Sequence, residues 1–239
     1  MKSGKRQEPG QSVFITGAGR GLGLCLATLF LEKGCSVFAG QYKETKNLAD
    51  IAVKGSPDLH VVRIDVADTE SVERASQNIG SLTTGLDVLI NNAAACEDEG
   101  STIEMLDFEK TSQLFNVNTL GPLRVTKAFL PLLRRGSMKT IVNISSEAGS
   151  IESCWRKGMF GYSMSKAALN MQSKLLENYL AGDGFRVLSI HPGWMRTDMG
   201  GKNADIEPRE AALGIYEIIN KRDKTTALYC DYKGKPLRY

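Results

Sequence analysis

The stretch Val13-Phe14-Ile15-Thr16-Gly17-Ala18-Gly19-Arg20-Gly21-Leu22-Gly23 sets the architecture expected for the whole chain. A short apolar run leads into four glycines within seven residues, and a helix-like segment follows over Leu22–Lys33. The common G-x-G-x-x-G spacing is not met, but the spacing T-G-x-x-x-G-x-G is. Glycines allow a tight turn with close backbone approach, and the following helix directs its first amides at a phosphate. We therefore predict a dinucleotide-binding loop, the alternative being a glycine-rich turn without a ligand.

Short apolar runs alternate with amphipathic stretches along the rest of the chain. Nearly continuous apolar strands separated by helices are typical of a parallel sheet covered on both faces, and right-handed crossovers make such a sheet doubly wound. We predict an α/β fold: a single Rossmann-type, doubly wound parallel sheet of about seven strands with helices on both faces. Residues 11–239 are expected to form one domain after a disordered lead-in over residues 1–10. The expected strands are Ser12–Thr16, Cys35–Ala39, Leu59–Ile64, Leu86–Ile90, Thr140–Ile144, Arg186–His191 and Ala227–Cys230, and the expected helices are Leu22–Lys33, Thr45–Val53, Thr69–Ile79, Asp107–Arg135, Tyr162–Ala181 and Pro208–Asn220.

Local signals place several helix ends. Asp68 or Thr69 can cap the third helix, and Pro208 suits the first turn of the last helix. Gly182 and Gly184 are expected to end the long helix that begins near Tyr162. The helix Asp107–Arg135 is too long to be unbroken, and Gly121-Pro122 predicts the position of its break.

The composition is that of an ordinary globular protein. Hydrophobic residues make up 42% and charged residues 24%, with a net charge of +3, which does not indicate nucleic-acid binding. No run of about eighteen apolar residues suggests a membrane span, and the polar start is unlike a signal peptide. Five scattered cysteines without a C-x-x-C pair, and only two histidines, predict reduced thiols and no metal site. A cytoplasmic protein is expected.

Tyr162 and Lys166 stand four residues apart in Gly161-Tyr162-Ser163-Met164-Ser165-Lys166. In a helix, that spacing places both side chains on one face. A phenol has a pKa of about 10 and is a poor acid or base at neutral pH, and a neighbouring ammonium lowers it. The pair is a candidate for proton transfer, although many such pairs are only exposed polar neighbours.

The end of the second strand indicates which dinucleotide is bound. An acidic residue there would accept hydrogen bonds from the adenosine ribose of NAD, but Gln41 follows the strand instead. Arg20 in the glycine loop and Lys43 beyond the strand are two cations that suit a ribose 2′-phosphate. We expect NADP(H), the alternative being that both cations are solvated surface charges.

These motifs together resemble the classical short-chain dehydrogenase/reductase family over nearly the whole chain. Asn91-Asn92-Ala93-Ala94 is similar to the family's N-N-A-G, with Ala94 in place of glycine. The long gap between Ser146 and Tyr162 resembles the C-factor/sniffer-like carbonyl reductase branch. The resemblance implies four catalytic residues, Asn118, Ser146, Tyr162 and Lys166, with Asn116 and Ser145 as less favoured neighbours. It implies cofactor contacts from Gly17, Gly19, Arg20, Gly21, Leu22, Gly23, Gln41, Lys43, Asp65, Val66, Asn92, Ala93, Ala94, Tyr162, Lys166, Pro192, Gly193, Met195 and Thr197.

The resemblance also implies an activity. Tyr162 would exchange the proton with the substrate oxygen, Lys166 would lower the tyrosine pKa and hold the nicotinamide ribose, and Ser146 would hydrogen-bond the carbonyl. Asn118 would anchor a proton-relaying water. We expect NADPH-dependent reduction of an aldehyde, ketone or quinone. The alternatives are an NAD-dependent alcohol or steroid dehydrogenase, or a dinucleotide-binding signalling protein with little turnover. Surplus apolar residues on two helices predict a homodimer or homotetramer.

Overall fold

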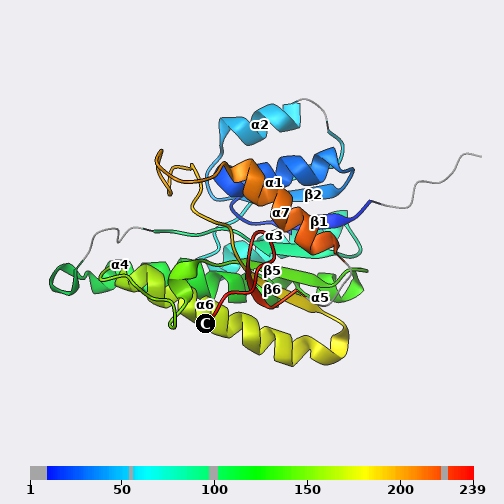
Figure 1. Cartoon of the computed structure of the whole chain (residues 1–239). Coiled ribbons are helices and arrows are strands. Elements are labelled where there is room, and N and C mark those ends of the chain that lie inside the picture. The colour runs from blue at the N-terminus through cyan, green and yellow to red at the C-terminus, as the bar shows by residue number, and fades with distance from the viewer. Residues whose placement is uncertain (1–9, 54–55, 97–101, 222–225) are drawn as a thin grey trace, which may run out of the picture.

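The structure is a computed structural model that describes residues 10–53, 56–96, 102–221 and 226–239 (Figure 1). Seven parallel strands form one sheet in the order β3-β2-β1-β4-β5-β6-β7. The predicted seven-stranded, doubly wound parallel sheet is thus confirmed, while residues 1–9 of the predicted lead-in lie outside the described residues. The strands are β1 Ser12–Ile15, β2 Ser36–Gln41, β3 Leu59–Arg63, β4 Val88–Asn91, β5 Thr140–Ile144, β6 Arg186–His191 and β7 Tyr229–Asp231.

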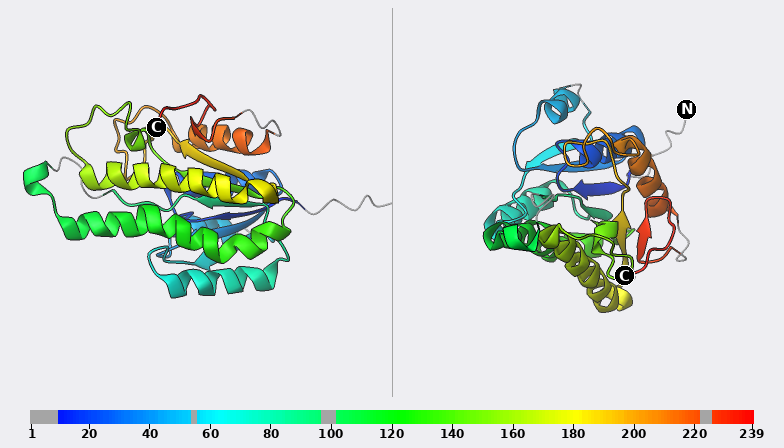
Figure 2. Two further views of the ribbon diagram at one scale, coloured as in Figure 1. Left: turned by 90° about the horizontal axis from the view of Figure 1, so that it is seen from below. Right: turned by 60° about the vertical axis from the view of Figure 1, so that its left-hand side comes forward.

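Helices cover both faces of the sheet. In Figure 1, α1 and α7 lie on one face, and α3, α5 and α6 lie on the other. The left view of Figure 2 shows α3, α5 and α6 side by side. The helices are α1 Gly21–Glu32, α2 Lys46–Val53, α3 Thr69–Leu82, α4 Phe108–Phe115, α5 Gly121–Arg135, α6 Phe160–Leu180 and α7 Pro208–Asn220.

Each face of the sheet has its own apolar core, because side chains along a strand point alternately to opposite faces. In β1, Val13 and Ile15 join the core under α1 and α7, whereas Phe14 joins the core under α3 and α5. Phe14 stacks on Phe129 of α5 with ring centroids 4.5 Å apart. The side chains of Val13, Phe14 and Ile15 are all fully buried, which explains why these three residues form a continuous apolar run in the sequence.

Winding in both directions from β1 creates the place for a site. The chain runs from β1 to β2 and β3 on one side, and then from β4 to β7 on the other. In the register, Val13 of β1 lies between Val37 of β2 and Val88 of β4. Crossovers leave in opposite directions at β1 and β4, so a crevice opens at their carboxyl ends. The glycine loop Gly17–Gly23 and the segment from Asn92 lie there.

The long helical stretch is interrupted earlier than predicted. Between α4 and α5, residues Asn116–Leu120 form a π-helical turn, and Gly121-Pro122 begins α5 instead of breaking a helix. Pro122 has no amide hydrogen, so it fits the first turn of α5, where no intrahelical donor is needed. Short π segments inside helices often mark functional sites, and this one carries Asn118.

Two other helix ends agree with the sequence prediction. Pro208 occupies the start of α7. Gly184 has a left-handed φ of 77° after the short 3-10 turn Ala181–Asp183 that ends α6. The last strand, in contrast, begins at Tyr229 rather than Ala227, because its pairing with β6 starts at Ser189.

Candidate active site

The glycine loop is packed against the segment after β4, and Gly17 and Gly23 have no room for a side chain. A Cβ atom on Gly17, whose φ is 67°, would lie 2.9 Å from Ala93 Cα, and one on Gly23 would lie 2.2 Å from the Gly17 carbonyl oxygen. Asn92 Nδ2 donates to the carbonyls of Thr16 at 2.9 Å and Gly17 at 3.2 Å. The loop is therefore a bare backbone cradle at the start of α1, which fits the pyrophosphate of a dinucleotide.

The segment after β4 is tied to the same loop. Thr16 Oγ1 accepts hydrogen bonds from the amides of Asn92 at 3.0 Å and Ala93 at 3.1 Å. Ala94, which replaces the glycine of the family pattern, is not among the described non-glycine residues with positive φ, which are Lys139 and Met159. Alanine is thus compatible with this backbone.

The end of β2 presents Gln41 toward the loop. Gln41 is buried, and its Oε1 accepts a hydrogen bond of 3.3 Å from Thr45 Oγ1. A Cβ on Gly19 would lie 2.8 Å from Thr45 Cγ2, so loop and strand end are adjacent. Lys43 is exposed, with its ammonium 5.8 Å from the centre of the Tyr42 ring. This strand end carries no carboxylate, as the sequence indicates.

Arg20 differs from the prediction in its surroundings. The sequence predicts two cations and no carboxylate near the 2′-phosphate, but the fold brings Asp198 to Arg20 with an N–O distance of 2.9 Å. Both side chains are about three-quarters exposed, at 74% and 76%. Exposed ion pairs of this kind contribute little, roughly 0–1 kcal/mol, so a phosphate can compete for the guanidinium.

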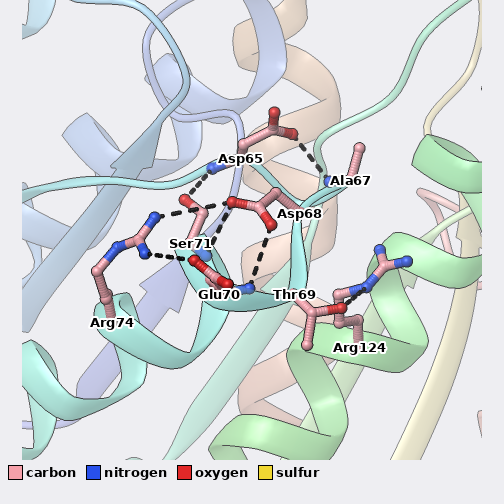
Figure 3. A network of polar contacts seen from close by, with 8 residues as sticks. All are labelled: Asp65, Ala67, Asp68, Thr69, Glu70, Ser71, Arg74 and Arg124. Carbon is pink, nitrogen blue, oxygen red and sulfur yellow. Dashed lines mark hydrogen bonds and ion pairs between the residues drawn. The ribbon is translucent and has the colours of Figure 1, made fainter.

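Asp65 and Val66 form a rigid turn after β3 (Figure 3). Asp65 Oδ1 accepts from the Ala67 amide at 2.9 Å, and the Asp65 amide donates to Ser71 Oγ at 2.9 Å. Asp68 caps α3 by accepting from the amides of Glu70 and Ser71, as predicted. Arg124 of α5 donates to the Val66 carbonyl. The turn expected to contact adenine is therefore held by its neighbours on both α3 and α5.

Asn118 connects three elements through its buried side chain. Its Oδ1 accepts from the Ala95 amide and its Nδ2 donates to the Ala95 carbonyl, both at 2.8 Å. Nδ2 also donates to Ser165 Oγ of α6 at 3.1 Å. Asn116 instead bonds Arg124 and the Ala67 carbonyl. The π turn thus aims Asn118, and not Asn116, at the segment after β4 and the helix of Tyr162.

The structure distinguishes the two serines at the end of β5. Ser145 Oγ donates to Asn170 Oδ1 at 2.7 Å, inside the buried layer. Ser146 has one of its hydrogen bonds with the Tyr162 side chain. Ser146 Oγ also accepts from the Ala148 amide at 3.1 Å, at the start of the 3-10 turn Glu147–Gly149. Ser146 is therefore the serine that faces Tyr162.

Tyr162 and Lys166 lie one turn apart on α6, but their pKa values differ from the prediction. Burial raises the pKa of the Tyr162 phenol well above its ordinary value, and the Ser146 hydrogen bond only partly offsets this. Burial lowers the pKa of Lys166 to about 8. Lys166 Nζ donates to the Ile144 carbonyl at 2.9 Å and lies 5.7 Å from the Tyr162 ring centre. The net shift of the Tyr162 pKa is therefore upward, opposite to the lowering that the spacing to Lys166 predicts, because desolvation by burial is its largest cause.

Two further charges near Tyr162 escaped the sequence analysis. Glu147 and Arg156 form a bidentate ion pair, with one N–O distance of 2.6 Å. The Glu147 carboxylate raises the pKa of Tyr162 and the Arg156 guanidinium lowers it. Cys96, after β4, also influences both Tyr162 and Lys166. Arg156 lies in the long gap between Ser146 and Tyr162. The length of that gap was the sequence feature that could have indicated a charged residue near Tyr162.

The segment after β6 approaches the glycine loop. Gly193 has a φ of 83°, and Met195 pairs with Ile206 in an isolated bridge. Thr197 Cγ2 would lie 3.3 Å from a Cβ on Gly21, and its Oγ1 accepts from the Gly200 amide at 3.1 Å. Pro192 is buried beside His191 at the end of β6. Of the predicted nicotinamide-side residues, Thr197 thus lies against the glycine loop, and the others stay predictions.

A sequence model of the short chain dehydrogenase family matches residues 11–207. The chain belongs to this family of oxidoreductases. An uncharacterised oxidoreductase of Schizosaccharomyces pombe is 37% identical over 242 residues, covering 92% of this chain and 95% of that protein. The C-signal protein of Myxococcus xanthus is 36% identical over 153 residues, covering 64% of this chain and 92% of that protein.

Solved structures of the family share the fold over nearly the full length. NADPH-bound carbonyl reductase from chicken fatty liver has a TM-score of 0.89 and 30% identity, covering 97% of this chain and 100% of that chain. The carbonyl reductase Sniffer of D. melanogaster has a TM-score of 0.90 and 30% identity, and the match covers 96% of this chain and 100% of that chain. The predicted resemblance to the C-factor/sniffer-like branch is therefore confirmed.

The described residues also bear on membrane spans and on the state of the cysteines. None of the helices described there is both long and apolar enough to cross a membrane. No disulfide joins the five cysteines, which all lie within the described ranges.

Proposed function

We propose that this short-chain dehydrogenase reduces a carbonyl compound to an alcohol with NADPH. The observation that carries the proposal is that Ser146, Tyr162 and Lys166 lie together at the end of the sheet where the glycine cradle follows β1. Carbonyl reductases among the neighbouring solved structures, one of them NADPH-bound, support the same activity. We further propose that the protein acts in the cytoplasm on a small-molecule substrate and consists of one domain.

The residues around the cradle fit NADP(H). The backbone of Gly17–Gly23 would hold the pyrophosphate, and Arg20 and Lys43 would meet the 2′-phosphate beside the neutral Gln41. Asp65 and Val66 would border the adenine, and the Asn92–Ala94 segment would line the ribose side. Lys166 would hold the nicotinamide ribose, and Pro192, Gly193, Met195 and Thr197 would border the carboxamide. When bound, the nicotinamide supplies the hydride.

The raised pKa of Tyr162 keeps the phenol in the protonated form that carbonyl reduction requires. Since the Tyr162 pKa lies above its ordinary value, the phenol is protonated at neutral pH and can give its proton to the substrate oxygen. Ser146 Oγ accepts from the Ala148 amide, and its hydroxyl shares a hydrogen bond with the Tyr162 side chain. We expect both hydroxyls to turn to the carbonyl oxygen of a bound substrate, where negative charge develops. Lys166, with a pKa of about 8, is charged at pH 7 and can restore the proton to Tyr162. Asn118 would anchor the water that connects Lys166 to solvent.

A second candidate function is dinucleotide-dependent signalling with little turnover. It is favoured by the similarity to the Myxococcus protein named C-signal. The NAD-dependent alcohol dehydrogenase is the third, and Gln41 in place of an acid disfavours it.

The test is turnover of aldehydes, ketones and quinones with NADPH and with NADH. We expect NADPH to be preferred. Tyr162→Phe should lower kcat by about a hundred- to ten-thousand-fold with near-normal NADPH affinity, because it removes the proton donor and keeps the ring. Lys166→Ala should lower both kcat and cofactor affinity. The double variant should be little slower than Tyr162→Phe alone, because the two residues act as one unit.

The control is Tyr216→Phe, at a tyrosine of α7 packed on Phe30 with 5.0 Å between ring centres. It should keep wild-type turnover. If Tyr162→Phe retains more than about a tenth of wild-type kcat with chemistry rate-limiting, the phenol is not the acid and the signalling function becomes the better explanation.

A further inference from the structure

The main chain of Ser146 is held by a tyrosine from the far edge strand. Tyr229 of β7 is 1% exposed, and its hydroxyl donates a hydrogen bond of 2.7 Å to the Ser146 carbonyl oxygen. Burial raises the pKa of Tyr229 to about 12, so the hydroxyl keeps its hydrogen at neutral pH. The Gly149 amide is the second donor to this carbonyl, at 3.0 Å.

The residues before and after Ser146 are fixed as well. Ser145 and Ser189 both donate to Asn170 Oδ1 at 2.7 Å, which ties the end of β5 to β6 and α6. After Ser146, the Ala148 amide bonds the Ser146 hydroxyl oxygen. Tyr229 supplies the side-chain contact, beside the Gly149 amide, that orients the peptide between these two anchors. A rotation of this peptide would shift the following Ala148 amide, whose hydrogen bond holds Ser146 Oγ in its position facing Tyr162.

A returning segment covers Tyr229. The Asp231 amide bonds the Lys235 carbonyl, and the Leu237 amide bonds the Tyr229 carbonyl at 3.0 Å, so the chain runs back along β7. Tyr239 then packs on Tyr229 with ring centres 5.3 Å apart. Its carbonyl accepts from the Glu152 amide at 2.8 Å, and Glu152 pairs with Arg238. The insertion before Tyr162 is thus bonded to the segment that covers Tyr229.

From this geometry we infer that Tyr229 is a positioning residue for Ser146 in carbonyl reduction. The inference rests on the proposed function, because it assigns to Tyr229 the task of keeping the Ser146 hydroxyl aimed at the substrate oxygen. Donors in a catalytic site work only within a narrow range of positions, so a neighbour that fixes their backbone affects the transition state more than substrate binding.

The decisive variant is Tyr229→Phe, which removes one hydroxyl and keeps the buried ring. Tyr232→Phe is the matched control, because the Tyr232 hydroxyl also donates at 2.7 Å, but to Glu210 of α7. We expect Tyr229→Phe to lower kcat about three- to ten-fold, the usual effect of one hydrogen bond, with KM and NADPH affinity near wild type. Tyr232→Phe should keep the wild-type kcat. Equal kcat in wild type and Tyr229→Phe would overturn the inference.

A double-mutant cycle shows whether the effect passes through Ser146. In the Ser146→Ala background there is no hydroxyl to aim, so adding Tyr229→Phe should change kcat by less than about two-fold. A merely structural role would instead give the same loss in both backgrounds, which would contradict the inference.

Amide hydrogen exchange provides a readout independent of turnover. Exchange of the Ala148 amide, which bonds Ser146 Oγ, should become faster in Tyr229→Phe and not in Tyr232→Phe. Unchanged exchange at Ala148 in both variants would refute the positioning role. If wild-type protein shows no turnover of any carbonyl, the proposed function fails. The exchange measurement would still test whether the Tyr229 hydroxyl holds the main chain at Ser146.

Discussion

Among the single side chains, buried Lys166 is expected to govern a measurable pH dependence of stability. Its pKa is about 8 in the folded protein and about 10.4 when unfolded. Between these values the unfolded state binds more protons, so stability rises with pH. Below pH 8 both states are protonated, and the folded state carries the full cost of the buried charge.

The variant Lys166→Met removes this titration. From pH 7.5 to 9.5, the free energy of unfolding of the wild type should rise by about 2 kcal/mol more than that of Lys166→Met. Urea denaturation of the cofactor-free proteins at both pH values measures the difference, in which the titration of all other groups cancels. Parallel pH curves for the two proteins would mean that Lys166 is not desolvated.

Gln41 is the side chain on which cofactor choice should depend. Gln41→Asp places a carboxylate beside the expected 2′-phosphate and offers an acceptor to ribose hydroxyls. We expect NADPH affinity to fall at least about ten-fold, a change of 1.4 kcal/mol, while NADH affinity rises. Fluorescence titration with both cofactors measures this, and the neutral Gln41→Asn serves as the control. Equal losses for both cofactors in Gln41→Asp would exclude a charge effect.

At the level of helices, the start of α3 is important because the same turn holds Asp65 and Val66. Asp68 accepts from the Glu70 amide at 3.2 Å and the Ser71 amide at 3.1 Å. Asp68→Ala leaves these two amides without a side-chain acceptor and should cost about 1 kcal/mol in the free energy of unfolding. Asp68→Asn retains the acceptor and should cost only a few tenths.

Urea denaturation should show this loss as a lower midpoint with an unchanged slope. The two variants share a position and differ in the acceptor, so equal stability of Asp68→Ala and Asp68→Asn would show that the cap contributes nothing.

For the whole molecule, an apolar groove between the start of α5 and the middle of α6 predicts self-association. The groove has a volume of about 430 Å³. Met171, Leu175 and Tyr179 along it are 62%, 60% and 73% exposed. Exposed apolar residues in a continuous row on one face mark an interaction site, and twofold pairing of such faces is the commonest arrangement.

We therefore expect a homodimer or homotetramer by light scattering at micromolar concentration. Leu175→Glu places a charge in the groove and should shift the protein to monomers. Leu213→Glu alters a leucine of α7 that is 41% exposed on the opposite face and should leave the assembly unchanged. A monomeric wild type, or an assembly that tolerates Leu175→Glu, would contradict the prediction.

Local features of the chain were enough to predict the architecture. Apolar runs such as Val13–Ile15 and the glycines after them require a buried strand and a tight turn wherever they lie. The cap at Asp68, the proline at the start of α7 and the left-handed Gly184 likewise depend only on near neighbours. The doubly wound arrangement followed from the right-handed crossovers that parallel sheets share, whereas the order of the strands came from the structure.

Long-range packing accounts for what the sequence did not reveal. Asp198 meets Arg20, Tyr229 meets Ser146, and Glu147 meets Arg156 because the fold joins segments that are separate in the chain. The pKa of Tyr162 is the clearest case. The four-residue spacing to Lys166 predicts a lowered value, but desolvation by the surrounding elements raises it. Spacing is a property of the chain, whereas desolvation depends on every atom packed around the phenol, and these come together only in the folded molecule.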